Sequence, residues 1–96
     1  MAYRYEFLEV AARVLFRLTR HIQPLLHQIV ATHIPAILQD PCKAGEPRKA
    51  DLAHARACGL KVKGVAYRLI YEVDGEVVRF IAIGPRGAAY ERARRR

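Results

Sequence analysis

The chain has 96 residues and a net charge of +8, and 52% of its residues are hydrophobic. This length allows one domain with a single modest core, and the composition favours a folded chain over a disordered one. No apolar run is long enough for a membrane-spanning helix and the first residues lack an apolar signal region, so we expect no membrane partner and a cytoplasmic location. Cys42 and Cys58 lack metal-ligand spacing and are expected to be free thiols.

The positive charge is concentrated in the second half of the chain. Residues 1–48 carry six Lys or Arg and four Asp or Glu, whereas residues 49–96 carry eleven and five. Such an uneven basic surface favours a polyanionic partner, either a nucleic acid or an acidic protein. A surface that only keeps the protein in solution is the alternative.

A short strand followed by two helices is predicted for the first forty residues. Tyr3 to Leu8 alternates and is rich in aromatic residues, and from Glu9 the apolar residues recur at helical spacing. A second helix is expected to begin near Pro24, because proline fits the first helical turn. Pro35 predicts a kink or a break with a short second segment, since an interior proline removes a hydrogen bond and clashes one turn back.

The middle of the chain is less regular. Asp40 to Asp51 is rich in turn formers and charged residues and is predicted to be the longest loop. Leu52 to Ala57 fits either a short strand or a helical turn. Cys58 to Lys63 alternates as a strand, and Gly64-Val65 is expected to turn the chain into a hairpin.

That hairpin is the most informative part of the sequence. Asp74-Gly75 is a strong signal for a two-residue turn, whose central positions both need positive φ. The turn predicts one apolar face and an opposite face on which Arg68 and Arg79 are diagonal neighbours, a pairing of like charges that suggests an anionic ligand. The predicted apolar face contains Tyr67, Leu69, Tyr71, Val73, Val78, Phe80 and Ala82, and the opposite face contains Ala66, Arg68, Ile70, Glu72, Val77, Arg79, Ile81 and Ile83.

The predicted elements follow the order β-α-α-β-β-β, which indicates an α+β fold with two helices packed on a four-stranded sheet. Residues 1–91 form the single expected domain, and residues 92–96 form an arginine-rich tail.

The chain resembles the RelE/ParE superfamily of toxins from bacterial type II toxin–antitoxin systems over almost its whole length. The resemblance rests on an ordered set of short motifs at family-like spacing. These are Asp40-Pro41, Gly45-Glu46-Pro47, Lys49, Asp51-Leu52, Leu60-Lys61-Val62-Lys63, the run from Tyr67 to Val73, Ile83-Gly84-Pro85-Arg86, and Tyr90.

This resemblance implies a curved, mostly antiparallel sheet against two helices, and a small acidic antitoxin encoded by an adjacent gene. RelE-like members of the superfamily cut mRNA in the ribosomal A site without a metal or other cofactor, whereas ParE-like members inhibit DNA gyrase. The mRNA endonuclease activity is the leading hypothesis for this chain. Gyrase inhibition is kept as the alternative, because the fold alone does not decide between the two activities. A member that only binds its antitoxin or operator DNA is a third possibility.

Four catalytic candidates follow from the resemblance. Lys61 matches a lysine that faces the scissile phosphate, and Arg68 matches a phosphate-binding arginine. Arg86, expected in a loop, matches an arginine that helps the leaving group, and Tyr90 matches a tyrosine that orients the substrate. The ordinary alternatives are a solvated Lys61, an Arg68 paired with Glu72 or Asp74, and a Tyr90 that packs in the core.

Three further cations are expected to bind nucleic acid. Lys63 matches a basic position of the family, and Arg56 begins a run of four cations that contains no acid. Arg79 shares the predicted hairpin face, although Glu72 could hold it in an ordinary ion pair. Gly59 departs from the family pattern, because a second lysine can occur there.

Overall fold

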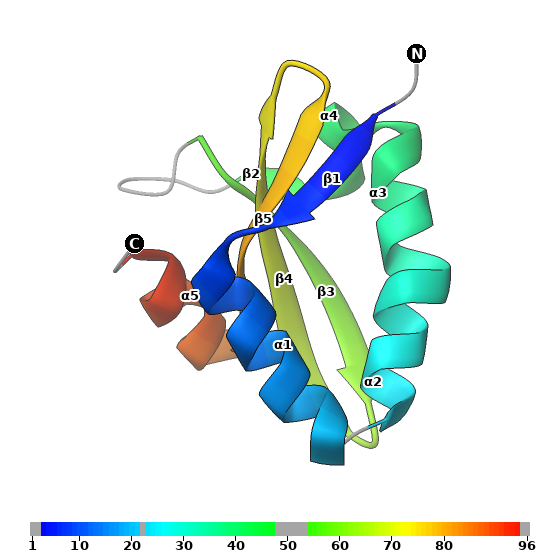
Figure 1. Cartoon of the computed structure of the whole chain (residues 1–96), viewed down its shortest axis with the longest axis vertical. Coiled ribbons are helices and arrows are strands. Elements are labelled where there is room, and N and C mark those ends of the chain that lie inside the picture. The colour runs from blue at the N-terminus through cyan, green and yellow to red at the C-terminus, as the bar shows by residue number, and fades with distance from the viewer. Residues whose placement is uncertain (1–2, 22, 48–53, 95–96) are drawn as a thin grey trace.

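The computed structural model describes residues 3–21, 23–47 and 54–94, without the side chains of Leu26 and Arg86. In these ranges a five-stranded sheet has helices on both faces (Figure 1). The elements are β1 (Arg4–Phe7), α1 (Glu9–His21), α2 (Gln23–Gln28), the π-helix η1 (Ile29–His33), α3 (Ile34–Gln39), α4 (Pro41–Ala44), β2 (Glu46–Pro47), β3 (Arg56–Val62), β4 (Val65–Asp74), β5 (Val77–Pro85) and α5 (Arg86–Arg94).

The strand order is β1-β5-β4-β3-β2, in which β1 runs parallel to β5 and the other neighbours are antiparallel. The expected α+β class and mostly antiparallel sheet are confirmed, but the sheet has five strands rather than four. The additional strand β2 has only two residues, which is too short to show alternation in the sequence. Together with α4 it replaces part of the predicted loop, and the rest of that loop, residues 48–51, lies outside the described residues.

The second helical segment changes its winding before Pro35. The backbone N–H of Ile34 donates to the carbonyl of Ile29, five residues back, and Pro35 lies at the start of α3. This π-type turn opens the helix where the proline ring would otherwise meet a carbonyl of the preceding turn. The break expected from Pro35 is therefore confirmed, as a change of helical winding.

The β4–β5 hairpin turns one residue later than predicted. Asp74 pairs with Val77, so Gly75 and Glu76 form the turn, and Gly75 has a φ of 60°. The predicted turn at Asp74-Gly75 is therefore wrong, but the shift of register is even and leaves the faces of β4 unchanged.

A β-bulge then changes the faces of β5. The pairing shifts between Ile70 and Tyr71, which leaves Ile81 as an extra residue in β5. As a result Ile83 enters the larger apolar core and Ala82 moves to the opposite face, the reverse of the predicted assignment.

The sheet separates two apolar clusters. The larger one lies against α1 and the run from α2 to α3, and the smaller one lies against α5. We call the side of the sheet covered by α5 the α5 face; its apolar part contains Ala57, Ile70, Ile81, Ala82, Ala89 and Ala93.

The C-terminal residues Arg92 and Arg94 belong to α5, so the expected boundary of a basic tail at residue 92 falls inside a helix. The end of that tail, residues 95 and 96, lies outside the described residues. No helix in the described ranges is long and apolar enough to cross a membrane.

Candidate functional site

The β3–β4 hairpin brings Lys61 and Arg68 to the same face of the sheet. Lys61 pairs with Ala66, and Gly59 pairs with Arg68, so the two cations are diagonal neighbours on the α5 face. Lys61 and Ala66 are both exposed. Lys61 therefore lies at the protein surface, whereas Arg68 is partly buried.

A tight turn ends this hairpin one residue earlier than expected. Its central residues are Lys63 and Gly64, with φ values of 51° and 81°. Positive φ at both positions is the geometry of a type I′ turn. Lys63 is therefore an exposed turn residue rather than a strand residue beside Lys61.

Arg68 lies between two glycines in a row across three strands. It pairs with Gly59 on β3 and with Gly84 on β5. A Cβ atom on Gly59 would lie 1.9 Å from Nη1 of Arg68, so the guanidinium occupies the space that a side chain at position 59 would need. The absence of a lysine at position 59 thus has a structural consequence: it lets Arg68 lie across β3.

The guanidinium of Arg68 is incompletely satisfied. Its Nε is buried and has no hydrogen-bond partner in the part of the chain that the structure describes. A buried donor without a partner is unfavourable by about 1–3 kcal/mol. Arg68 is also absent from the ion pairs found among the described residues, and a guanidinium without a carboxylate partner is well suited to a phosphate oxygen.

The charge of Arg68 also affects the pKa of Cys58 on the neighbouring strand. Burial raises the pKa of the Cys58 thiol, and the positive charge of Arg68 acts in the opposite direction. Cys58 Sγ lies 3.9 Å from Nδ1 of His33, whose pKa is lowered by burial. Both groups are only partly buried, and Cys58 packs against the larger core on the face of the sheet opposite Lys61 and Arg68.

The start of α5 lies beside this row. Arg86 is the first residue of α5 and follows Gly84 by two positions, so its backbone is close to the strand position opposite Arg68. The predicted loop around Arg86 is therefore a helix start. Tyr90 is half-buried and packs against the apolar cluster beneath α5. Tyr90 thus has a packing role whatever else it does.

Arg92 was not among the predicted site residues. Its Nη1 donates a 2.7 Å hydrogen bond to the carbonyl of Ile83, and a Cβ on Gly84 would lie 2.2 Å from the same nitrogen. Arg92 therefore lies over Gly84 as Arg68 lies over Gly59. The sequence offered no signal for this contact, because Arg92 reads as the first residue of an arginine-rich tail.

Arg79 occupies a different environment from the one predicted. It pairs with Glu72 on β4 and with Glu6 on β1, and it is not a diagonal neighbour of Arg68. Its guanidinium lies 2.7 Å from Glu6, 3.7 Å from Glu72 and 3.6 Å from Asp74. The hydrogen bond to Glu6 is the main cause of its raised pKa. Arg79 is therefore held by carboxylates, as the alternative interpretation anticipated.

Arg56 lies on the face opposite Lys61 and Arg68, because side chains alternate along β3. It donates to the carbonyl of Gly45 and lies close to the hydroxyl of Tyr71. Burial is the main cause of the raised pKa of Tyr71, while hydrogen bonds from Gly45 N–H and Arg56 act against it. The structure thus separates Arg56 from the predicted cationic site.

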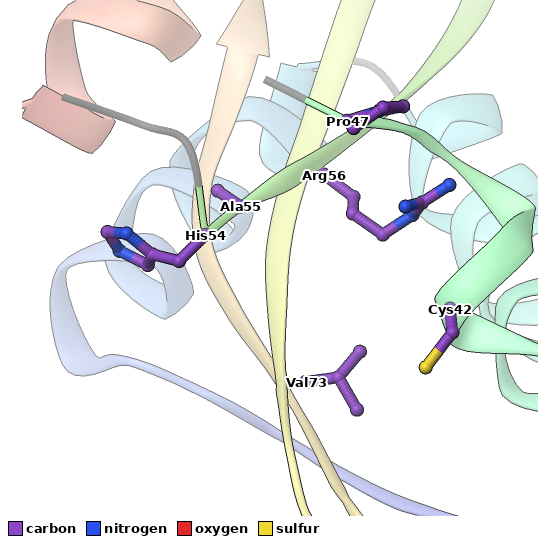
Figure 2. A pocket seen from close by; sticks show the side chains of 6 residues that line it. All are labelled: Cys42, Pro47, His54, Ala55, Arg56 and Val73. Carbon is purple, nitrogen blue, oxygen red and sulfur yellow. The ribbon is translucent and has the colours of Figure 1, made fainter. Parts of the chain in front are cut away.

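A pocket of about 180 Å³ lies next to Arg56 (Figure 2). Figure 2 shows Arg56 extending toward Cys42, away from His54.

His54 lies 3.2 Å from a carboxylate oxygen of Glu72. Within the described residues, no group of three His, Cys, Asp or Glu residues is arranged to hold a metal ion.

Comparison with known proteins identifies the family. The model for the ParE-like toxin of type II bacterial toxin–antitoxin systems matches residues 9–94. A chain of the crystal structure of the RelBE2 toxin–antitoxin complex from Mycobacterium tuberculosis is 22% identical with a TM-score of 0.64, and the match covers 88% of this chain and 99% of that chain. None of the curated proteins matches.

A second solved structure is a mutant of the E. coli toxin RelE in the free state, which is 26% identical with a TM-score of 0.68. This match covers 97% of the present chain and 95% of the RelE chain. The expected superfamily is thus confirmed by both sequence and fold. The chain belongs to the ParE-like toxins of type II bacterial toxin–antitoxin systems.

Proposed function

We propose that this toxin is a RelE-like, ribosome-dependent mRNA endonuclease that an antitoxin holds inactive. The observation that carries the proposal is the guanidinium of Arg68, which is half-buried, lies beside exposed Lys61, and leaves its Nε without a partner in the described ranges. A cationic pair of this kind is suited to a phosphodiester. The likeness in fold to the toxin RelE supports the same assignment.

The proposed reaction requires three contributions from the protein. The ribose 2′-OH attacks the adjacent phosphorus, the bond to the 5′-oxygen breaks, and a 2′,3′-cyclic phosphate forms. A group must accept the 2′-OH proton, cations must stabilise the charge on the phosphate, and a donor must assist the leaving oxygen. Lys61 and Arg68 would bind the phosphate, Arg86 would assist the leaving group, and Tyr90 would orient the nucleotide or relay a proton.

The antitoxin is the second proposed partner. The matched structure from M. tuberculosis is a toxin–antitoxin complex. A small acidic protein would complement the net charge of +8 and could cover the α5 face. A short acidic reading frame next to the gene would support this assignment.

DNA gyrase inhibition is the alternative function. The matched family model carries the ParE-like description, and position 59, where the resemblance allows a second lysine, is a glycine. In this alternative the same basic surface would bind a protein or DNA rather than cut RNA, and no catalytic group would be needed.

Induced expression separates these functions. Protein synthesis and DNA synthesis are measured by labelled methionine and labelled thymidine after induction of the wild type and of the variants Lys61→Ala, Arg68→Ala and Arg86→Ala. We expect early arrest of translation by the wild type and little or no arrest by each variant, because removing one charge-stabilising donor typically slows such a reaction by about 10²–10³-fold.

Arg20→Ala is the matched control, since Arg20 is an exposed arginine of α1. It should arrest translation as the wild type does. Continued translation with arrested DNA synthesis, or equal toxicity in all the variants, would overturn the proposed activity.

A further inference from the structure

Arg92 and Arg68 have matching positions on the α5 face. Gly59, Arg68 and Gly84 form one row across β3, β4 and β5. The guanidinium of Arg68 fills the space above Gly59, and the guanidinium of Arg92 fills the space above Gly84. Because paired Cα atoms of neighbouring strands lie about 5 Å apart, the two glycines are about 10 Å apart.

The hydrogen bond of Arg92 orients its charge without neutralising it. Nη1 donates to the carbonyl of Ile83, which uses one of five N–H donors. A carbonyl carries no net charge, so the guanidinium remains a full cation. If Arg92 served only to hold α5 against the sheet, the single N–H donor that bonds to the Ile83 carbonyl would be sufficient.

The acids that the strands contribute to this face lie on β1 and β4, away from the glycine row, and α5 contributes the exposed Glu91. Glu6, Glu72 and Asp74 surround Arg79, and Glu72 also pairs with His54. The ion pairs found among the described residues include neither Arg68 nor Arg92. The strands of the α5 face thus have a neutralised end near Arg79 and a cationic end at Arg68.

We propose that Arg92 is a second phosphate-binding arginine, which contacts a phosphate of single-stranded RNA next to the one bound by Arg68. The two glycines hold the guanidinium groups low against the backbone of the sheet, where a strand of RNA can lie over both. This inference rests on the proposed function for its ligand, but it concerns binding and is independent of the cleavage step.

The salt dependence of RNA binding tests the proposal. A short, fluorescently labelled single-stranded RNA is titrated with purified wild-type toxin, Arg92→Gln and Arg94→Gln over a range of salt concentrations. The Gln side chain keeps an N–H donor on a shorter stem and has no charge. Arg94 is the matched control, because it is an exposed arginine of the same helix.

We expect the slope of log K against log salt concentration to become shallower by about 0.7 in Arg92→Gln, the change for one phosphate contact to a single strand. Arg94→Gln should keep the wild-type slope, and Arg92→Lys should keep it as well. An unchanged slope in Arg92→Gln, or equal changes in Arg92→Gln and Arg94→Gln, would refute the contact. If Arg92 had a purely structural role, Arg92→Gln would lower the thermal stability of the protein and leave the salt dependence of RNA binding unchanged.

A second measurement uses the wild-type protein alone, in case Arg92→Gln does not fold. The NMR signal of the Arg92 Nε–H group should shift when the RNA is added, and the Arg79 signal should stay in place. An unmoved Arg92 signal at saturating RNA contradicts the proposal. Neither result depends on whether the toxin arrests translation, so the failure of this inference and the failure of the proposed activity are distinguishable.

Discussion

Arg68 and Gly59 are partners across β3 and β4, and the guanidinium of Arg68 takes the space that a side chain at position 59 would occupy. The glycine therefore sets the position of the arginine. From the sequence resemblance Gly59 counts only as one cation fewer, whereas the structure shows that a side chain at this position would displace Arg68.

Gly59→Ala should separate toxicity from stability. The new Cβ would meet only the flexible end of Arg68, and the φ of Gly59 is not positive, so the backbone can accept alanine. We expect an unchanged or slightly higher melting temperature, because alanine reduces the entropy of the unfolded chain. Toxicity should fall, since Arg68 must leave its position.

The measurements are thermal unfolding and growth after induction. Gly87→Ala is the control, because a Cβ at that position meets no atom within 4 Å. It should retain toxicity. A fully toxic Gly59→Ala protein would show that the position of Arg68 over Gly59 is unimportant.

Arg68→Met and Arg79→Met should have opposite effects. Methionine keeps much of the apolar stem in both cases. In Arg68→Met a buried donor that has no partner among the described residues disappears, so stability should be unchanged or higher while RNA cleavage is lost. In Arg79→Met the carboxylates of Glu6, Glu72 and Asp74 lose their shared cation.

The Arg79→Met protein should therefore melt at a lower temperature and remain toxic. Added salt should narrow its difference in melting temperature from the wild type, because the exposed ion pairs are screened. If Arg79→Met instead loses toxicity without any change in melting temperature, Arg79 belongs to the functional surface after all.

Tyr71→Phe should destabilise the fold by about 1–3 kcal/mol. The Tyr71 hydroxyl is buried, donates to the carbonyl of Pro41 at 2.9 Å and accepts from the N–H of Gly45 at 2.9 Å. Its removal leaves both backbone groups without this partner and loosens the segment between α4 and β2. Urea unfolding should show a lower midpoint with an unchanged slope.

Tyr5→Phe is the control for this substitution, since Tyr5 is 46% exposed. Its midpoint should stay close to that of the wild type. An equal loss of stability in both variants would mean that the buried Tyr71 hydroxyl contributes no more to stability than the exposed Tyr5 hydroxyl.

Stability should decline at mildly acidic pH because of His33. Burial lowers the pKa of His33 in the folded protein below the ordinary value of 6.5. The unfolded chain therefore binds more protons than the folded chain as the pH falls through that value. The contribution of neutral His33 is complete above the unfolded pKa and is lost below it.

The urea midpoint measured between about pH 5 and about pH 8 tests this prediction. His33→Gln should flatten the decline near the ordinary histidine pKa, and His27→Gln, a change at an exposed residue, should leave the decline in place. The assignment to His33 fails if both variants follow the wild-type curve.

Much of the fold could be predicted from local patterns. The alternation of apolar residues along β4 places Tyr67, Leu69 and Tyr71 in the core, and all three are buried. The break expected from Pro35 also follows from local chemistry, because a proline lacks an N–H and clashes with the preceding turn. Such signals act over a few residues and need no knowledge of the rest of the chain.

The site was only partly predictable for the same reason. Lys61 and Arg68 share a face because β3 and β4 are adjacent in sequence and joined by a tight turn. The partners of Arg79 could not be foreseen, because Glu6 comes from β1 at the other end of the chain. The exchange of Ala82 and Ile83 depends on a bulge, which the apolar pattern of β5 does not reveal.

The amino-acid order thus determined the class of fold, the buried face of β4 and the adjacency of β3 and β4 in a hairpin, since these depend on side-chain alternation and turn chemistry between near neighbours. Only the folded chain decided which arginines are neutralised and which lie over glycines. Those outcomes depend on contacts between segments distant in sequence: β1 beside β5 for Arg79, and α5 folded back over the end of β5 for Arg92. Long-range packing places each guanidinium next to a carboxylate or next to open backbone. A local sequence pattern cannot predict which of the two it will be.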